Sequence, residues 1–273
     1  STGTLRIFVQ STLGPIPVEG ALVTVTYNEQ ADNVIETLTT NSSGQTTPIT
    51  LLAPPLEYSM IPNEPRPYSE YEVTVSAPGY ETVTVNGTEI LPTQNAILTV
   101  YMPPLEFPNE PKQNINIPDH TLYGNYPPKI PEDEVQPLPD TGEIVLSRVV
   151  IPEYIIVHDG VPSDSSAKDY YVTYKDYIKN VACCEIYSTW PESCIYANIL
   201  AIMSFTLNRV YTEFYRNKGY NFTITSTTAY DHKFINGRNI FDTISVVVDD
   251  IFDTYIKRPA TARQPLLAQY CDG

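Results

Sequence analysis

Basic residues and cysteine are scarce in this 273-residue chain. Sixteen Lys and Arg stand against 32 Asp and Glu, for a formal net charge of −16, which argues against nucleic-acid binding through a basic surface. The four cysteines (183, 184, 194 and 271) show no CxxC spacing, so we expect neither a zinc site nor another cofactor. No apolar run reaches the length of a membrane span, because Asn198 interrupts residues 195–207.

Tyrosine and proline are abundant, with 21 and 25 copies. Residues 1–102 alternate apolar and polar positions in short runs, of which Leu5, Ile7 and Val9 form the first. About seven such runs, separated by turn clusters, predict an antiparallel β-sandwich. The stretches 20–25, 40–44 and 71–81 resemble the carboxypeptidase regulatory-like (transthyretin-like) sandwich, a module found with many functions.

Residues 103–142 are rich in proline and carry the acidic run 132–134. Proline lacks the amide proton that a helix or an inner strand requires, so this segment is predicted to run extended over a surface. Tyr123, Tyr126 and Ile130 are suited to contact a partner domain. We therefore place a linker at 103–150, between domains at 1–102 and 151–273.

Residues 173–185 carry a clear helical pattern. Thr173 is a suitable N-cap, and apolar side chains then recur on one face that ends at Glu185. A carboxylate in apolar surroundings tends to keep its proton, and a carboxylic acid that is protonated near neutral pH is what a general acid needs. On the pattern alone, however, a helix-end Glu that turns to solvent or pairs with a lysine is the simpler interpretation.

A second helix is predicted directly after the first. Residues 189–192 fit the S/T-x-x-E capping box, with Pro191 in the first turn, so Glu192 is interpreted as a cap. Apolar spacing continues this helix to about Arg216, with Gly219 as its C-terminal stop. A third helix is expected over 240–255 and strands over 154–157 and 265–270. His158, at the end of a strand, is most simply a hydrogen-bonded turn residue.

The helix that ends in Glu185, followed by a short turn, an aromatic residue and a proline, resembles the core of the SpoIID/LytB domain. A fuller resemblance is to the clostridial spore cortex-lytic enzymes of the SleC type. It covers most of residues 120–273 and is carried by the stretches 154–160, 171–191, 201–209, 230–234, 237–241 and 264–273. The family's Asp-Gln-x-Tyr segment matches residues 231–234, with His232 in place of Gln. Relatives continue past Gly273, so this chain is expected to stop short of the full domain.

The resemblance implies an α+β multidomain protein. An N-terminal β-sandwich at 1–102 is followed by a Pro-rich linker or propeptide at 103–150. A mainly helical SpoIID-like catalytic domain with a few strands then occupies 151–273.

The resemblance also implies an activity, that of a lytic transglycosylase acting on peptidoglycan glycan strands in the spore cortex, outside the cytoplasm. Glu185 is its catalytic acid and base. A subtilisin-like germination protease would activate the zymogen by cutting near residues 149–151. The substrate contacts implied are Tyr187, Trp190, Tyr230, Asp231, His232, Arg238, Gln269 and Tyr270.

Other functions stay open at this point. A hydrolase normally uses two carboxyl groups, and Asp231 is the candidate for the second. The chain could instead be a non-catalytic wall-binding module, or an inactive zymogen fragment that binds glycan without cleaving it.

Overall fold

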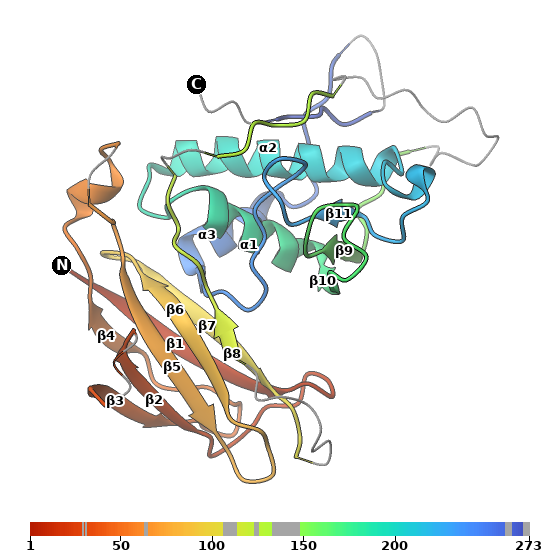
Figure 1. Ribbon diagram of the computed structural model, residues 1–273. Coiled ribbons are helices and arrows are strands. Elements are labelled where there is room, and N and C mark those ends of the chain that lie inside the picture. The colour runs from red at the N-terminus through yellow and green to blue at the C-terminus, as the bar shows by residue number, and fades with distance from the viewer. Residues whose placement is uncertain are drawn as a thin grey trace. The chain divides into compact units, whose positions relative to one another are not determined.

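The computed structural model describes residues 1–28, 30, 32–62, 65–105, 114–122, 126–132, 148–259 and 264–269 (Figure 1). Within these residues the fold is mixed α and β, with three α-helices and three sheets. The chain forms two compact units. The two-sheet unit comprises Ser1–Tyr123, Tyr187–Thr189 and Asn236–Thr243, and the helical unit comprises Gly124–Ile186, Trp190–Ile235 and Ile244–Gly273.

The two-sheet unit contains one four-stranded and one five-stranded sheet. The four-stranded sheet has the order β12-β7-β1-β4, in which β1 pairs parallel with β7 and antiparallel with β4. The other has the order β3-β2-β5-β6-β8. Their bounds are β1 (Thr2–Ser11), β2 (Leu22–Tyr27), β3 (Val34–Thr39), β4 (Ile49–Leu52), β5 (Ser69–Ser76), β6 (Val83–Ile90), β7 (Asn95–Met102), β8 (Asn114–Asn116) and β12 (Ile240–Phe241), with a 3-10 turn η1 at Leu56–Ser59.

The core of this unit follows from the alternation in its strands. Leu5, Ile7 and Val9 are fully buried along β1, as the sequence predicts, and Val73 and Val75 are fully buried along β5. Every second side chain of a strand points to the same face, so these apolar positions line the inner face of each sheet. β8 lies in the Pro-rich region and is the edge strand of its sheet, where proline-rich sequence is tolerated.

The two-sheet unit does not end at residue 102, where the sequence suggested a boundary. It extends to Tyr123 and includes two short stretches from later in the chain. One of these supplies β12, which pairs antiparallel with β7. The other contains Thr189, whose hydroxyl donates to Ser59 Oγ at 2.8 Å. Sequence-distant residues therefore complete this unit.

The helical unit contains most of the helices and one small sheet. Its helices are α1 (Tyr174–Glu185), α2 (Glu192–Tyr211) and most of α3 (Asp242–Ile251), with a 3-10 turn η2 at Arg216–Lys218. The sheet has the order β10-β9-β11, formed by β9 (Tyr154–His158), β10 (Asp169–Thr173) and β11 (Ile224–Thr225). None of the helices in the described ranges has both the length and the apolar character that a membrane span requires.

Helix α1 agrees with its prediction. Thr173 is the N-cap, and its Oγ1 accepts a hydrogen bond from the Asp176 amide at 3.2 Å. The apolar side chains on its predicted face are buried, namely Tyr174, Ile178, Val181 and Ala182. Glu185 is the last residue of the helix and lies between buried and exposed.

The structure differs from the prediction after α1. The capping box is wrong, because the N-cap of α2 is Pro191, which makes no side-chain cap, while the Thr189 hydroxyl binds Ser59. Helix α2 ends at Tyr211 rather than near Arg216. Gly219 does adopt the left-handed conformation expected of a C-terminal stop, at φ 85°, but it ends the 3-10 turn η2.

Two further segments also differ. Ile240 and Phe241, expected in a helix, form β12, and the helix begins only at Asp242. Two adjacent apolar residues fit the sequence pattern of a helix and of a short strand equally well. The pairing of Ile240 and Phe241 with β7 decides for the strand. The expected strand at 265–270 reduces to a single bridge between Pro265 and Lys257 within the described residues.

Candidate functional site

The candidate site is built around the carboxyl group of Glu185 at the C-terminal end of α1. One carboxylate oxygen, Oε1, accepts a hydrogen bond from the Lys233 amide at 2.8 Å. Lys233 lies in the loop after β11, so this contact joins the helix end to residues 231–235. The residue as a whole is partly exposed.

Asn180 fixes this loop on the helix. Its Nδ2 donates to the Ile235 carbonyl oxygen at 2.8 Å, and its Oδ1 accepts from the Ile235 amide at 3.1 Å. Asn180 is buried, and a buried amide that satisfies both backbone groups of one residue defines the position of that residue closely. Two helix side chains, Asn180 and Glu185, thus hold the loop at Ile235 and Lys233.

Asp231 anchors the start of the same loop. Its side chain is fully buried and accepts from Arg209 Nε at 2.6 Å and from the Tyr215 hydroxyl at 2.6 Å. It also accepts from the amide and the hydroxyl of Thr225 at 2.8 and 2.6 Å. A buried carboxylate that accepts hydrogen bonds from four donors has a structural role, because it connects the residues that supply them.

Arg209 links Asp231 to the Pro-rich segment. Its guanidinium binds Glu132 in a bidentate pair, with Nη1–Oε2 and Nη2–Oε1 distances of 2.6 and 2.8 Å. Phe214 lies against the guanidinium, 3.9 Å from ring centre to Cζ. Arg209 is almost fully buried, and it can be so only because two carboxylates and the aromatic ring compensate its lost hydration.

Residues 126–132, here called the strap, are therefore part of the helical unit. The Ile130 amide donates to the Ala229 carbonyl at 2.8 Å, and Lys129 Nζ donates to the carbonyl oxygen of Asp231. Together with Glu132, these contacts fasten the strap to the loop that touches Glu185. The expectation that Ile130 contacts a folded domain agrees with this placement, whereas Tyr123 lies outside the described residues.

The electrostatic surroundings of Glu185 favour its protonated form. Burial raises the pKa of this carboxyl group, and the Lys233 amide and the ammonium groups of Lys129 and Lys233 offset only part of that rise. Burial in turn lowers the pKa of the Lys129 ammonium, against the pull of Glu185 and Asp231. A carboxyl group with a raised pKa, on a residue that is partly exposed as a whole, is suited to donate a proton to a bound substrate.

His232, an expected substrate contact, is fully buried. Its Nδ1 lies 3.2 Å from the Tyr177 hydroxyl, and its ring centre lies 4.5 Å from that of Phe205. Burial, with Lys129 and Arg209 adding to it, lowers the pKa of His232 well below its usual range. A neutral imidazole packed against aromatic rings contributes to the core between α1 and the loop.

Two other expected contacts belong to the two-sheet unit. The Tyr187 hydroxyl donates to the His120 carbonyl at 3.1 Å. The Arg238 side chain is fully buried and its Nη2 binds Glu89 Oε2 at 2.9 Å. The site proposed below is built from residues of the helical unit, so neither of these residues enters it.

The remaining expected contacts lie in the helical unit or beyond the described residues. Trp190 and Gln269 are partly exposed, and Tyr270 falls outside the described ranges, as does Cys271. Tyr230 is partly exposed and helps to line a cavity of about 410 Å³. The other residues that line this cavity are Ile130, Pro131, Glu132, Pro162, Ser163, Phe214, Tyr215, Lys218 and Tyr220.

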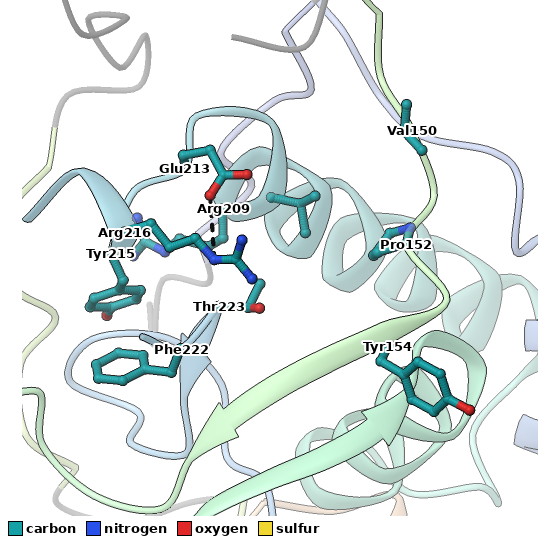
Figure 2. A pocket seen from close by; sticks show the side chains of 10 residues that line it. Val150, Pro152, Tyr154, Arg209, Glu213, Tyr215, Arg216, Phe222 and Thr223 are labelled. Carbon is teal, nitrogen blue, oxygen red and sulfur yellow. Dashed lines mark ion pairs between the residues drawn. The ribbon is translucent and has the colours of Figure 1, made fainter. Parts of the chain in front are cut away.

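A second cavity, of about 210 Å³, also includes Tyr215 and is lined further by Val150, Tyr154, Arg209, Phe222 and Thr223 among others. Figure 2 shows Arg209, Tyr215 and Phe222 around it, with the Arg216–Glu213 ion pair (3.5 Å) at its edge. Arg209 and Tyr215 thus contribute both to this cavity and to the network around Asp231. Among the described residues, no group of three or more His, Cys, Asp or Glu is arranged to hold a metal ion.

Sequence reasoning did not identify four residues that shape the site, namely Lys129, Glu132, Asn180 and Arg209. Arg209 carried a usable signal, because it is a charged residue in the apolar run of α2, and a buried charge requires a partner. Asn180 carried a weaker one, as an amide within an otherwise buried helix face. Nothing in the Pro-rich segment indicates that Lys129 and Glu132 contact the helical unit.

No protein-family model matches this chain, and no curated protein matches it. Several solved structures overlap with parts of it. They include the TIE protein of Bacillus anthracis (20% identity, TM-score 0.26, 38% of this chain and 17% of that one). They also include the 5-hydroxyisourate hydrolase of Klebsiella pneumoniae (17%, 0.24, 37% and 90%) and the catechol 1,2-dioxygenase of Acinetobacter sp. ADP1 (15%, 0.27, 42% and 58%). Overlaps with such low TM-scores support no conclusion about activity.

Proposed function

We propose that this chain is a peptidoglycan lytic transglycosylase of the spore cortex in which Glu185 acts as both general acid and general base. The observation that supports this best is the raised pKa of Glu185, a partly exposed residue at the helix end where the SpoIID/LytB resemblance requires the catalytic acid. The proposal carries with it the SleC-type arrangement of an N-terminal transthyretin-like sandwich and a SpoIID-like helical domain.

The placement of Asp231 supports a one-carboxyl mechanism. A hydrolase with two carboxyl groups needs the second one to reach the sugar or a water molecule, but the Asp231 side chain is fully buried and accepts four hydrogen bonds. A transglycosylase avoids this requirement because its substrate supplies the nucleophile. Hydrolysis is therefore the less favoured of the two reactions.

The proposed reaction has two steps. First, the Glu185 carboxyl group gives its proton to the glycosidic oxygen as the bond to C1 of N-acetylmuramic acid breaks. The resulting carboxylate then takes the proton of the C6 hydroxyl of the same sugar, and O6 bonds to C1 to close a 1,6-anhydro ring. Glu185 ends protonated, as it began, and no water is consumed.

The groups around Glu185 suit both steps. The Lys233 amide and the Lys129 ammonium stabilise the carboxylate that forms in the first step. Burial opposes the carboxylate and returns the group to its acid form. Lys129 lies in the strap, within the segment proposed as a propeptide. If activation by a subtilisin-like protease finally removes the strap, Glu185 loses this ammonium and becomes a weaker acid that is protonated over a wider pH range.

The first test is digestion of purified spore cortex, with mass spectrometry of the released muropeptides. We expect products one water lighter than hydrolysis fragments. Glu185→Gln keeps an acceptor for the Lys233 amide and removes the titrating proton, so activity should fall by about 10²–10⁴-fold. Glu192→Gln, on an exposed glutamate at the start of α2, is the matched control and should retain activity.

Three results would contradict parts of the proposal. Cleavage that survives Glu185→Gln rules out its catalytic role. Ordinary reducing ends in place of anhydro ends indicate a hydrolase. Glycan binding without products, from a protein that has been proteolytically activated and extended at its C-terminus, indicates a wall-binding module instead.

A further inference from the structure

The two-sheet unit contains a buried ion pair whose partners lie 149 positions apart in the sequence. Glu89, at the end of β6, is almost fully buried, and its Oε2 lies 2.9 Å from Arg238 Nη2 and 3.1 Å from His120 Nδ1. Burial would raise the pKa of Glu89, but Arg238 and His120 outweigh it and hold the pKa below its usual range. Glu89 is therefore an ionised carboxylate that depends on Arg238.

The residue after Arg238 binds the same strand. The Asn239 side chain accepts from the Glu89 amide at 2.9 Å and donates to the Glu89 carbonyl at 2.9 Å. Asn239 is fully buried. One side chain thus satisfies both backbone groups at the end of β6, which otherwise would need other partners.

The next residues close an edge of the other sheet. Ile240 and Phe241 form β12, which pairs with Ile97 and Ala96 of β7 and is the edge strand beside it. Asp242 Oδ2 then accepts from Asn95 Nδ2 at 2.7 Å, and the Thr243 hydroxyl donates to Gln94 at 2.8 Å. Adding a strand to a sheet edge is a common mode of protein association, with main-chain hydrogen bonds supplying affinity.

A second attachment lies in the helical unit. The strap precedes the stretch 133–147 in the chain, yet it is held by residues that follow that stretch. Arg209 binds Glu132, Ala229 accepts from Ile130, and Asp231 accepts from Lys129. The N-terminal part of the chain therefore makes buried contacts with the C-terminal part in each of the two units.

We infer that a backbone cut between residues 123 and 148 does not release the N-terminal part of the chain, and that residues 236–243 hold it in a two-fragment complex. A cut within 133–147 leaves both attachments in place. A cut within 123–125 moves the strap to the C-terminal fragment, so that the segments within the two-sheet unit, chiefly 236–243, hold the N-terminal fragment by themselves. This inference does not depend on the glycan chemistry proposed above.

For the zymogen proposal, the consequence is that one proteolytic cut is not enough to remove the strap. A cut near residues 149–151, like one within 133–147, falls between the strap and the residues that hold it, so Lys129 and Glu132 stay in place against Asp231 and Arg209. The strap can leave with the whole N-terminal fragment only if the contacts of residues 236–243 and those of the strap itself both dissociate. Alternatively, a second cut before residue 126 frees the strap from the two-sheet unit, and the strap leaves once the Arg209–Glu132 pair is lost. The protein after one cut is thus expected to be a two-chain species.

The test uses the full-length protein with the recognition site of a specific protease inserted either within 123–125 or within 133–147. After complete cleavage, checked on a denaturing gel, size-exclusion chromatography with light scattering gives the native mass. We expect both cut proteins to elute at the mass of the intact chain, about 30.6 kDa. Elution of two separate folded fragments from either protein overturns the inference.

Variants then identify the residues that hold the complex. In the protein cut within 123–125, Arg238→Ala leaves Glu89 buried without its guanidinium, and the dissociation constant should rise by about 100-fold or more. Arg216→Ala removes an arginine that is exposed in the helical unit, and it should leave the dissociation constant unchanged. Equal effects of the two substitutions would overturn the assignment to residues 236–243.

Because Arg238→Ala could prevent folding altogether, Asn239→Ala is the milder second variant. It removes the two hydrogen bonds to the Glu89 backbone, and we expect the dissociation constant to rise by about tenfold. Circular dichroism of the uncut variants shows whether each one folds. An Asn239→Ala protein that folds and stays associated as tightly as the parent after the cut also contradicts the inference.

Discussion

Glu185 is the last residue of α1 and stays partly exposed as a whole, yet its carboxyl group has a raised pKa. The side chain follows a fully buried face of α1, and burial raises its pKa. The Lys233 amide, with the ammonium groups of Lys129 and Lys233, offsets only part of that rise. Such a residue costs stability at neutral pH, which is common where a group is kept for its chemistry.

The pH dependence of this cost has a definite sign. Because the pKa of Glu185 is higher in the folded than in the unfolded protein, its stabilising contribution is complete below the unfolded pKa and is lost as pH rises through the folded pKa. Glu185→Gln does not titrate. We therefore expect it to be more stable than the parent by roughly 0.5–2 kcal/mol at pH 7, with the difference vanishing near pH 4.

Thermal unfolding followed by circular dichroism at several pH values measures this difference. Glu192→Gln, on the exposed surface of α2, is the control and should stay within about 0.5 kcal/mol of the parent at every pH. A Glu185→Gln protein whose stability relative to the parent does not change between pH 4 and pH 7 would show that the pKa of Glu185 is not raised.

Asn180 connects helix α1 to the loop after β11 through side-chain hydrogen bonds. Asn180 binds both backbone groups of Ile235, and Glu185, further along the helix, binds the Lys233 amide. The loop is also anchored at Asp231 by Arg209. Asn180 is therefore a positioning residue, which acts on Glu185 through the loop.

Asn180→Ala tests this role. Loss of two hydrogen bonds in a buried position should lower the free energy of unfolding by about 2 kcal/mol. With the Lys233 amide displaced, the pKa of Glu185 should rise further, so the loss of glycan cleavage at high pH should move to higher pH. The neighbouring control is Lys179→Ala, which breaks an ion pair with the exposed Asp249 and should cost less than about 1 kcal/mol.

The pH profile separates positioning from a purely structural role. If Asn180→Ala lowers stability but keeps the pH profile of Lys179→Ala and of the parent, the loop does not tune Glu185. This outcome is also distinct from failure of the glycan proposal, in which case none of the three proteins shows cleavage.

Each of the two units is formed by stretches that are not contiguous in the sequence. The two-sheet unit takes in Tyr187–Thr189 and Asn236–Thr243, and the helical unit takes in the strap. Each unit is thus completed by residues from the far side of the linker. A cut or a truncation chosen from the domain pattern of the sequence removes buried partners rather than only a tether.

The fragment 1–102 is a direct test. It contains Glu89 but lacks His120, Arg238 and Asn239, and an isolated buried carboxylate is costly. We expect this fragment to show no cooperative thermal transition, or one well below that of the full chain, by circular dichroism. Glu89→Leu in the same fragment removes the charge and should partly restore the transition.

A fragment 1–102 that unfolds cooperatively, with Glu89→Leu giving no gain, would mean that the sandwich expected from the sequence is autonomous. In that case the contacts of residues 236–243 would be incidental to its folding. The fragment experiment removes the contacts of residues 236–243, whereas the cut full-length protein keeps them, so the two experiments test the same contacts.

The elements that could be predicted are those with a strong local signal. The alternation in β1 and β5, the face of α1 and its Thr173 cap all agree with the structure. The failures fall where a distant partner competes with a local pattern. Thr189 binds Ser59 instead of capping α2, and residues 240–241 pair with β7 instead of starting a helix.

The candidate site divides in the same way. Glu185 could be singled out because helical periodicity places it at the end of an apolar face, and a family resemblance adds weight to it. Asp231 and His232 could be named, but their complete burial could not. Burial depends on which side chains come together from α1, α2 and the loop, and a local pattern does not contain that information.

From the sequence alone follow the repeating strands of the first hundred residues and the helix ending in Glu185, because each depends on spacing along a few turns or strands. Tertiary structure alone decides that the strap lies against Arg209 and Asp231, and that Glu89 is paired with Arg238. Buried charges select partners by proximity in space, and sequence separation places no limit on that choice.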